Sequence, residues 1–265
     1  MFKREHTIYR GDTNFEHYEV VDMVYEGRPA RVLFTNRHRA AQSGIATDKN
    51  PALLFDYNQR FFELAQSLRP QNILIVGGGA YTLPLALASE LPQAFIDVIE
   101  IDPGLDAIAS GFFGFKPNDH LRIIHADGRD YLDKTSQKYD LIIIDVFMGT
   151  EVPYEFLTLE ATVSLQHSLT PHGTVAMNVI GIFNGSGMKL KSLIASYQHV
   201  FKQTKVHPAD PTLSLLISQN FIILGQNTDN LRYAMQSPSL SVPDISIDAA
   251  LFDNPHTVTL LYQTS

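Results

Sequence analysis

The stretch "ILIVGGGAYTLPLALA", residues 73–88, constrains the fold more than any other part of the sequence. Four apolar residues typical of a strand lead directly into three glycines, and an apolar, helix-like segment follows. Glycine permits positive φ and lets a ligand approach the main chain, as in nucleotide-binding turns between a strand and a helix. Tight packing of a strand against a helix also uses glycine, so the turn alone leaves both explanations open.

Strands and helices alternate in the sequence after Pro70. Helical segments include Glu155–Leu169 and Met188–Phe201. Short β-rich runs separated by helices predict a mostly parallel sheet with helices on both faces, which is an α/β, Rossmann-type fold. The predicted strands are Asn72–Val76, Phe95–Ile101, Leu121–His125, Tyr139–Asp145, Gly173–Val179, Gln203–His207 and Asn220–Gly225.

The first part of the chain predicts a small β domain. Segment 17–36 contains two β-rich runs around the turn signal Glu26-Gly27-Arg28-Pro29, which indicates a hairpin. Segment 37–51 is expected to be a loop, and apolar residues at helical spacing follow it. We therefore predict an N-terminal β-hairpin domain at 1–50, a Rossmann-like domain at 51–236 and a tail at 237–265 that packs on the Rossmann-like domain.

Acidic residues follow three of the predicted strands. Glu100 lies about 20 residues after the glycines, the spacing of a ribose-binding acid, and Asp102 competes for that role. Asp127, followed by Gly128, is placed to accept a hydrogen bond from an adenine amino group. Asp145 ends an apolar run that predicts a strand buried on both faces. Ligands bind outside the carboxyl ends of such strands, so we expect these acids to share one pocket. Each acid alone is also explained as a helix N-cap or a turn residue.

The net charge and the apolar segments of the chain argue against two kinds of binding partner, nucleic acid and membrane. The net charge of −8 argues against nucleic acid, which needs a basic surface. The N-terminal residues lack the apolar core of a signal peptide, and the glycines and Pro84 interrupt the apolar segment after residue 73. We expect a soluble, cytoplasmic protein that binds neither nucleic acid nor membrane.

No metal site is predicted. The chain contains no cysteine, and none of its ten histidines lies in a His-Glu-x-x-His pattern. His120 and His125 lie five residues apart across a predicted turn and strand, which is not a recognised ligand spacing.

Several of these motifs together resemble the spermidine synthase family. The resemblance covers most of the chain and lies in "LIVGGGAYT", "VIEID", "HADGRDYL", "YDLIIIDVF" and "VPYEFLTLEATVSLQHSLTPHGTVAMNV", with "LFDNPHTVTLLY" as a degenerate closing segment. It implies a methyltransferase-type Rossmann fold, a β-hairpin N-terminal domain, an amine substrate and a role in polyamine biosynthesis. Relatives in this family often form dimers, so the resemblance also implies a homo-oligomer.

The resemblance implies a site for an adenosyl-sulfonium donor. Gly77, Gly78 and Gly79 would approach the donor, Glu100 would hold its ribose and Asp127 its adenine. Gln42 in "AAQSG" matches a family glutamine that reaches the donor from the hairpin domain. Asp145 would deprotonate an amine that attacks the aminopropyl carbon of decarboxylated S-adenosylmethionine and releases methylthioadenosine.

The chain departs from the family pattern around the acceptor. Ala80 follows the glycines where the family has an aspartate, and Met148 stands three residues after Asp145 in place of a second acid. Tyr57 is a weak substitute for the family's Tyr-His-Glu element. Each missing carboxylate removes attraction for an ammonium group, worth about 1 kcal/mol at 4 Å in water and several times more in a partly buried cleft.

These departures keep three functions open. Aminopropyl transfer to an amine is the leading hypothesis, based on Asp145. Methyl transfer from intact S-adenosylmethionine, which yields S-adenosylhomocysteine, is the second, because alanine at position 80 could admit the donor carboxylate that an aspartate would repel. A catalytically silent nucleoside-binding protein is the third, because the acceptor site has lost acidic groups.

Overall fold

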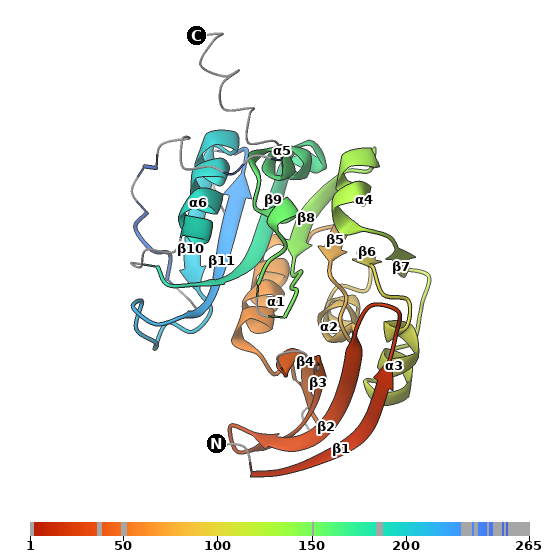
Figure 1. Ribbon diagram of the computed structural model, residues 1–265. Coiled ribbons are helices and arrows are strands. Elements are labelled where there is room, and N and C mark those ends of the chain that lie inside the picture. Colours follow the sequence, from red (N-terminus) through yellow and green to blue (C-terminus); the bar gives the residue numbers. More distant parts are fainter. Residues whose placement is uncertain are drawn as a thin grey trace.

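The structure, a computed structural model, describes residues 3–35, 39–48, 52–149, 151–183, 188–228, 235, 238–242, 244–245, 251 and 253. Within these residues the chain forms a four-stranded antiparallel sheet near the N-terminus and a seven-stranded sheet with helices on both faces (Figure 1). The prediction of an α/β fold with a mostly parallel sheet is therefore confirmed.

The N-terminal sheet is larger than the predicted hairpin. Its strands lie in the order β1 (Lys3–Asp12), β2 (His17–Tyr25), β3 (Arg28–Thr35) and β4 (Ala40–Ala46), all antiparallel. The hairpin corresponds to β2 and β3. The expectation of a loop over 37–51 is wrong for 40–46, because β4 pairs with β3 along that segment. β4 consists mainly of Ala, Ser and Gly, whose weak β-propensity gives no signal in the sequence, and pairing with β3 satisfies its backbone instead.

The central sheet reverses its strand order next to β5. The chain runs from β5 outward to β6 and β7, then returns to β8 on the other side of β5. Strands β5 to β9 are parallel to one another, and the pairs β9–β11 and β10–β11 are antiparallel. Such a reversal opens a crevice at the carboxyl ends of the two strands that flank it. The sheet order is β10 (Gln203–Pro208), β11 (Gln219–Gln226), β9 (Leu169–Gly181), β8 (Tyr139–Ile144), β5 (Asn72–Val76), β6 (Phe95–Glu100) and β7 (Leu121–His125).

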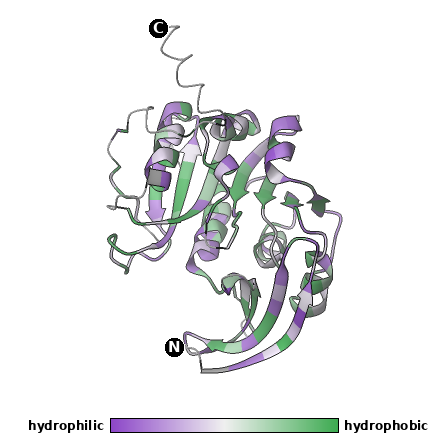
Figure 2. Cartoon of the chain, in the orientation of Figure 1, coloured by the Kyte–Doolittle hydropathy of each residue, from purple (hydrophilic) through white to green (hydrophobic). Residues whose placement is uncertain are grey.

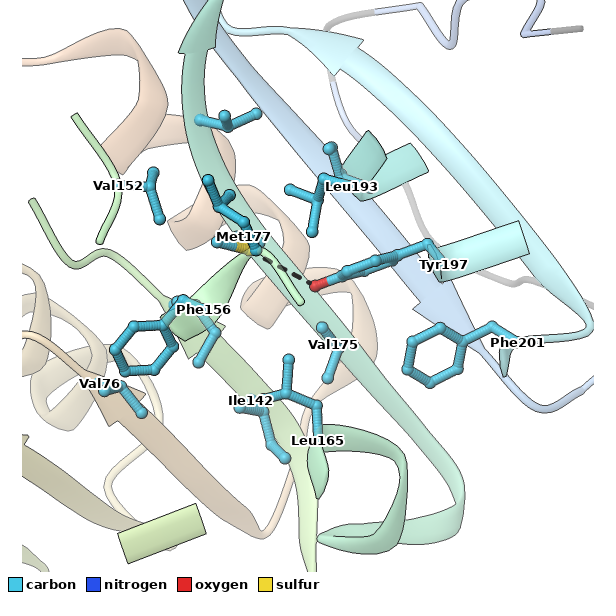
Figure 3. Close-up of a cluster of buried hydrophobic side chains, with 14 of the residues drawn as sticks. Val76, Ile142, Val152, Phe156, Leu165, Val175, Met177, Leu193, Tyr197 and Phe201 are labelled. Atoms are coloured by element: carbon cyan, nitrogen blue, oxygen red, sulfur yellow. Dashed lines mark hydrogen bonds between the residues drawn. The ribbon is translucent and has the colours of Figure 1, made fainter. Parts of the chain in front are cut away.

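Helices cover both faces of this sheet, and most of the strand colouring in Figure 2 is accordingly hydrophobic. One core contains Ile73 and Ile75 with α1, α2 and α3, whereas Leu74 and Val76 face the other core with α4, α5 and α6. Figure 3 shows the second core, where the Tyr197 hydroxyl donates to the sulfur of Met177 over 3.8 Å. The helices are α1 (Asp56–Leu68), α2 (Thr82–Glu90), α3 (Leu105–Phe112), α4 (Gly128–Lys134), α5 (Leu159–His167), α6 (Met188–Val200) and the short 3₁₀ turn η1 (Tyr154–Phe156).

None of the helices within the described residues combines the length and hydropathy that a membrane span requires.

Only parts of the predicted tail fall within the described residues. The Leu240 N–H donates to the Val206 carbonyl over 2.7 Å, and the Leu251 carbonyl accepts from the Leu159 N–H over 2.6 Å. Asp253 pairs with Arg129 of α4 at 2.9 Å. These segments therefore contact the central domain. Residues 49–51 and 236–237, around the predicted domain boundaries, lie outside the described residues, so the boundaries stay a prediction.

Replacing Ile143 tests the central strand directly. Ile143 is fully buried in β8, so Ile143→Ala is expected to lower the free energy of unfolding by about 2–5 kcal/mol through lost burial and a cavity. Urea unfolding followed by circular dichroism measures the change. Leu216→Ala at an exposed position, where 69% of the side chain is accessible, should cost less than about 0.5 kcal/mol. Equal losses in the two variants would contradict the burial of β8.

Candidate active site

A pocket of about 870 Å³ lies at the carboxyl ends of β5, β6 and β8. The N-terminal sheet lies on this side of the central sheet (Figure 1). The pocket is lined by every residue that the sequence marked for the site: Gln42, Tyr57, Gly77, Gly78, Gly79, Glu100, Asp102, Asp127, Gly128, Asp145 and Met148. The fold thus brings these residues together at the reversal of strand order, as predicted for the three strand-end acids. Their individual roles stay predictions.

The three glycines are required by packing. Gly77 has φ +95°, and a Cβ there would lie 2.3 Å from the Asp145 carbonyl oxygen. A Cβ on Gly79, at φ +52°, would lie 2.5 Å from Ser43 Oγ of β4, and one on Gly78 would meet the ring of Tyr81. Glycine is therefore needed at all three positions even without a ligand. A ligand is therefore indicated by the position of the turn in the pocket wall, and not by the three glycines themselves.

Ser43 also fastens the turn to the N-terminal sheet. The Ala80 N–H donates to Ser43 Oγ over 3.0 Å. Ala80 itself is fully buried against Tyr18, Leu33 and Leu105 and does not line the pocket. Its side chain therefore opens no space for a donor carboxylate, which removes the sequence-based argument for intact S-adenosylmethionine.

Glu100 holds the glycine turn from the end of β6. Its Oε2 accepts from the N–H groups of Gly78 and Gly79 over 2.8 and 3.2 Å, and its Oε1 accepts from the Asp102 N–H over 2.9 Å. Burial raises the pKa of Glu100, and the three backbone hydrogen bonds oppose that rise. The side chain is 7% exposed and lines the pocket. The carboxylate thus fixes the shape of the turn at the pocket wall.

Asp102 links the N-terminal sheet to the central sheet. Its Oδ2 accepts from Thr13 Oγ1 of the β1–β2 connection over 2.6 Å, and its Oδ1 accepts from the Gly104 N–H before α3 over 2.9 Å. The side chain is buried. Both oxygens thus have partners in the protein, as both oxygens of Glu100 do, so these hydrogen bonds do not distinguish the two acids.

Asp127 is the N-cap of α4, the alternative that its sequence position left open. Its Oδ1 accepts from the Asp130 N–H over 2.9 Å, and its side chain is exposed at the pocket. The next residue must be glycine, because a Cβ on Gly128 would lie 2.4 Å from Val76 Cγ1. The cap fixes the orientation of Asp127, and the residue still faces the space where a ligand would lie.

Asp145 follows β8 and is held by a chain of amides. Asn178 Nδ2 of β9 donates to Asp145 Oδ1 over 3.0 Å, and Asn220 Nδ2 of β11 donates to Asn178 Oδ1 over 2.9 Å. Burial raises the pKa of Asp145 to about 6, and the hydrogen bond from Asn178 opposes that rise. A carboxyl group with this pKa is mostly ionised at neutral pH and is close enough to neutrality to exchange a proton.

The sequence-based predictions did not include Asn178 and Asn220 as site residues. A signal was present, because asparagine interrupts the apolar run "VAMNVI" of β9, and a buried amide needs partners. The partner could not be identified from sequence, since Asn178 and Asn220 meet Asp145 only through the sheet order β11–β9–β8.

Three other residues predicted for the site line the same pocket as Asp145. Burial raises the pKa of the Tyr57 hydroxyl well above its usual value, and the negative charge of Asp145 adds to the rise. Gln42 Nε2 makes only long contacts, of 3.4 Å with Thr35 Oγ1 and 3.5 Å with the Gly149 carbonyl. Met148 is 72% exposed at the rim of the pocket. Tyr57 thus lies near the candidate base, whereas Met148 supplies no charge to it.

The charged residues of the pocket wall are all acidic. No lysine, arginine or histidine lines it within the described part of the chain. Charges of one sign in a low-dielectric cleft attract the opposite charge, so this pocket favours a cationic ligand. The eight acids are Glu16, Asp56, Glu100, Asp102, Asp127, Asp145, Glu155 and Asp210.

The residues described by the structure contain no group of three or more His, Asp or Glu side chains that could hold a metal ion.

The fold and the sequence resemble known aminopropyltransferases. The structure of a probable spermidine synthase from Corynebacterium glutamicum superposes with a TM-score of 0.73, at 23% identity, over 84% of this chain and 81% of that one. A polyamine aminopropyltransferase from Vibrio vulnificus is 29% identical over 181 residues, which cover 66% of this chain and 60% of the relative. In sequence and fold the chain is thus similar to spermidine synthase-like proteins with a methyltransferase-type fold. No protein-family model matches it.

The chain is also similar to methyltransferases. The human eEF1A lysine and N-terminal methyltransferase is 29% identical over 181 residues, covering 64% of this chain and 24% of the relative. The structure of human methyltransferase-like protein 13 in complex with SAH has a TM-score of 0.56 at 26% identity, over 67% of this chain and 84% of that one. The chain thus spans 60% of the bacterial relative and about a quarter of the human one.

Removing the amide beside the candidate base should change its titration. In Asn178→Leu the carboxylate loses a hydrogen bond that favours its charged form, so the pKa of Asp145 should rise further above about 6. Titration of the carboxyl group by ¹³C NMR measures the shift, with Asp145→Asn used to assign the resonance. An unchanged or lower pKa would show that Asn178 does not stabilise the ionised carboxylate.

Proposed function

We propose that the protein is a transferase that binds a decarboxylated S-adenosylmethionine-type donor and moves its aminopropyl group to an amine, with Asp145 as the base. The acidic pocket wall around Asp145 carries this proposal, because both the sulfonium of the donor and the ammonium of the acceptor are cations. The similarity to relatives named as aminopropyltransferases and methyltransferases supports a transferase with an adenosyl donor.

The donor fits the glycine end of the pocket. Glu100 and Asp127 would bind the ribose and the adenine, and Gln42 would contact the donor from β4. No lysine, arginine or histidine within the described lining is available to pair with a carboxylate on the donor. That charge balance favours the decarboxylated donor over intact S-adenosylmethionine.

Asp145 would perform two tasks in succession. A free amine has a pKa near 10, so at neutral pH the acceptor arrives as an ammonium, which the Asp145 carboxylate binds. The carboxylate then accepts one proton as the nitrogen lone pair attacks the aminopropyl carbon. A C–N bond forms, the C–S bond breaks and its electron pair stays on sulfur, which becomes the neutral thioether of methylthioadenosine. Because sulfonium is already a good leaving group, the protein mainly supplies alignment and this one base.

Methyl transfer to an amine is the second candidate, favoured by the similarity to the human methyltransferase. The same base and the same nucleoside subsite would serve it. A silent nucleoside-binding protein is less well supported, because Asp145 keeps a raised pKa and an orienting amide. A cytoplasmic location and a homodimer stay predictions.

Calorimetry and turnover separate these functions. We expect decarboxylated S-adenosylmethionine to bind more tightly than intact S-adenosylmethionine, and the product methylthioadenosine to bind more tightly than S-adenosylhomocysteine. Asp145→Asn should slow aminopropyl transfer by about 100-fold or more, since it removes the base, while methylthioadenosine still binds. Asp119→Asn, at an exposed position outside the pocket, is the matched control.

Tighter binding of the carboxylated donor, with methylated amine as product, would replace aminopropyl transfer by methyl transfer. Binding without any turnover, equal in the wild type and Asp145→Asn, would leave only the silent protein.

A further inference from the structure

The loop between β8 and α5 forms one side of the pocket. Within this loop, Pro153, Glu155 and Phe156 line the pocket. Asp127 and Gly128, at the start of α4, line it as well. A Cβ on Gly128 would lie 3.0 Å from Phe156 Cζ, so the two segments are in contact there. The pocket wall at the predicted adenine position thus consists of two segments that pack against each other.

Arg129 joins these two segments through hydrogen bonds. Its Nη1 donates to the Glu155 carbonyl over 2.9 Å and to Thr158 Oγ1 over 3.3 Å. The Thr158 hydroxyl also caps α5, because it accepts from the Ala161 N–H over 3.2 Å. The Arg129 side chain is 13% exposed and does not belong to the described lining of the pocket. Arg129 therefore supports the wall from behind and does not contact the space inside.

The C-terminal segment binds the same guanidinium. Asp253 Oδ2 accepts from Arg129 Nη2 over 2.9 Å, and Asp253 Oδ1 accepts from Arg129 Nη1 over 3.2 Å. A bidentate pair of this kind fixes the orientation of both side chains. Arg129 Nε donates to the carboxylate of Asp133 in α4 over 3.1 and 3.2 Å. Each nitrogen of the guanidinium thus has a partner, and the group is held between α4, the loop and Asp253.

Two further contacts attach the C-terminal segment to the start of α5. The Leu251 carbonyl accepts from the Leu159 N–H over 2.6 Å. The Asp253 N–H donates to Glu160 Oε2 over 3.0 Å. Arg129 links the same segment to α4. Residues near the end of the chain are therefore fastened on both sides of the loop that lines the pocket.

The charges around Arg129 agree with a supporting role. Burial acts to lower the pKa of Arg129, but the hydrogen bonds with Asp253 and Asp133 outweigh burial, so the pKa is raised. The guanidinium therefore stays charged. Because these two acids compensate it outside the pocket lining, Arg129 does not neutralise the acidic wall.

We propose that Arg129 is a positioning residue of the donor site and that Asp253 holds it in place, so that the C-terminal segment sets the affinity for the nucleoside. This inference rests on the proposed function, because it concerns the wall where the adenine of the donor would lie. Arg129 orders the loop at 155–156 against Asp127 and Gly128 before a ligand arrives. A wall that is ordered in advance spares binding the cost of ordering it.

Calorimetric titration of the full chain with methylthioadenosine tests this link. Asp253→Asn and Arg129→Gln should each weaken binding by about 2- to 30-fold, the range for residues that touch no ligand. The double variant should bind no more weakly than Arg129→Gln alone, because Asp253 acts through Arg129. Asp253→Glu keeps the carboxylate and should restore most of the affinity. Lys134→Gln is the matched control, because it removes an exposed ion pair with Asp130 on the same helix.

Steady-state kinetics separates positioning from a general loss of structure. Asp253→Asn should raise KM for decarboxylated S-adenosylmethionine and leave kcat and the KM for the amine unchanged, because Asp145 lies outside the link. Circular dichroism should show that the variant is folded. Equal losses in kcat and in both KM values would indicate a general loss of structure and would overturn the inference.

The inference and the proposed function fail in different ways. Unchanged affinity for methylthioadenosine in either Asp253→Asn or Arg129→Gln overturns the inference, even if the wild type transfers aminopropyl groups. Binding of adenosyl compounds by the wild type without aminopropyl transfer overturns the proposed function, and the same titrations then still decide the inference. Failure of every adenosyl compound to bind overturns both.

Discussion

The contact between the ends of β5 and β8 is the constraint on which the rest of the site depends. Gly77 lies so close to the Asp145 carbonyl that a single Cβ would come within 2.3 Å of it. The two strands can meet this closely only because the sheet reverses its order between them and because residue 77 has no side chain. The glycine turn and the candidate base are therefore neighbours through their backbones. The backbone alone thus holds the glycine turn beside Asp145, without any help from flexible side chains.

Residues of both the N-terminal sheet and the central sheet line the pocket. Ser43 of β4 accepts a hydrogen bond from the Ala80 N–H, and Thr13 of the β1–β2 connection donates one to Asp102 beyond β6, so two separate segments of the small sheet reach the pocket wall. The central domain supplies the carboxyl ends of its strands, and the small sheet covers them. Polar contacts at both points therefore hold the small sheet against the central sheet beside the pocket.

Much of the fold could be predicted from sequence because it depends on local pattern. β5 and β7 have the predicted bounds, since apolar runs flanked by turn residues mark buried strands clearly. β4 escaped detection because "AAQSGIA" has small residues whose strand state comes from pairing with β3. Glu100 and Asp145 could be predicted to line the pocket, because each is an acidic residue at the end of an apolar strand pattern. Asn178 could not be identified as a site residue, because it meets Asp145, 33 positions away in the chain, only through the order of the strands in the sheet.

The uniform sign of the pocket wall has a consequence for the end of the proposed reaction. The sulfonium enters as a cation into a field of eight carboxylates, and the transfer discharges it to an uncharged thioether. The spent nucleoside therefore loses the Coulomb attraction that drew its precursor in, while its ribose and adenine contacts are unchanged. The reaction itself would thus weaken the binding of the nucleoside product. A new cationic donor would then displace this product without any opening of the pocket.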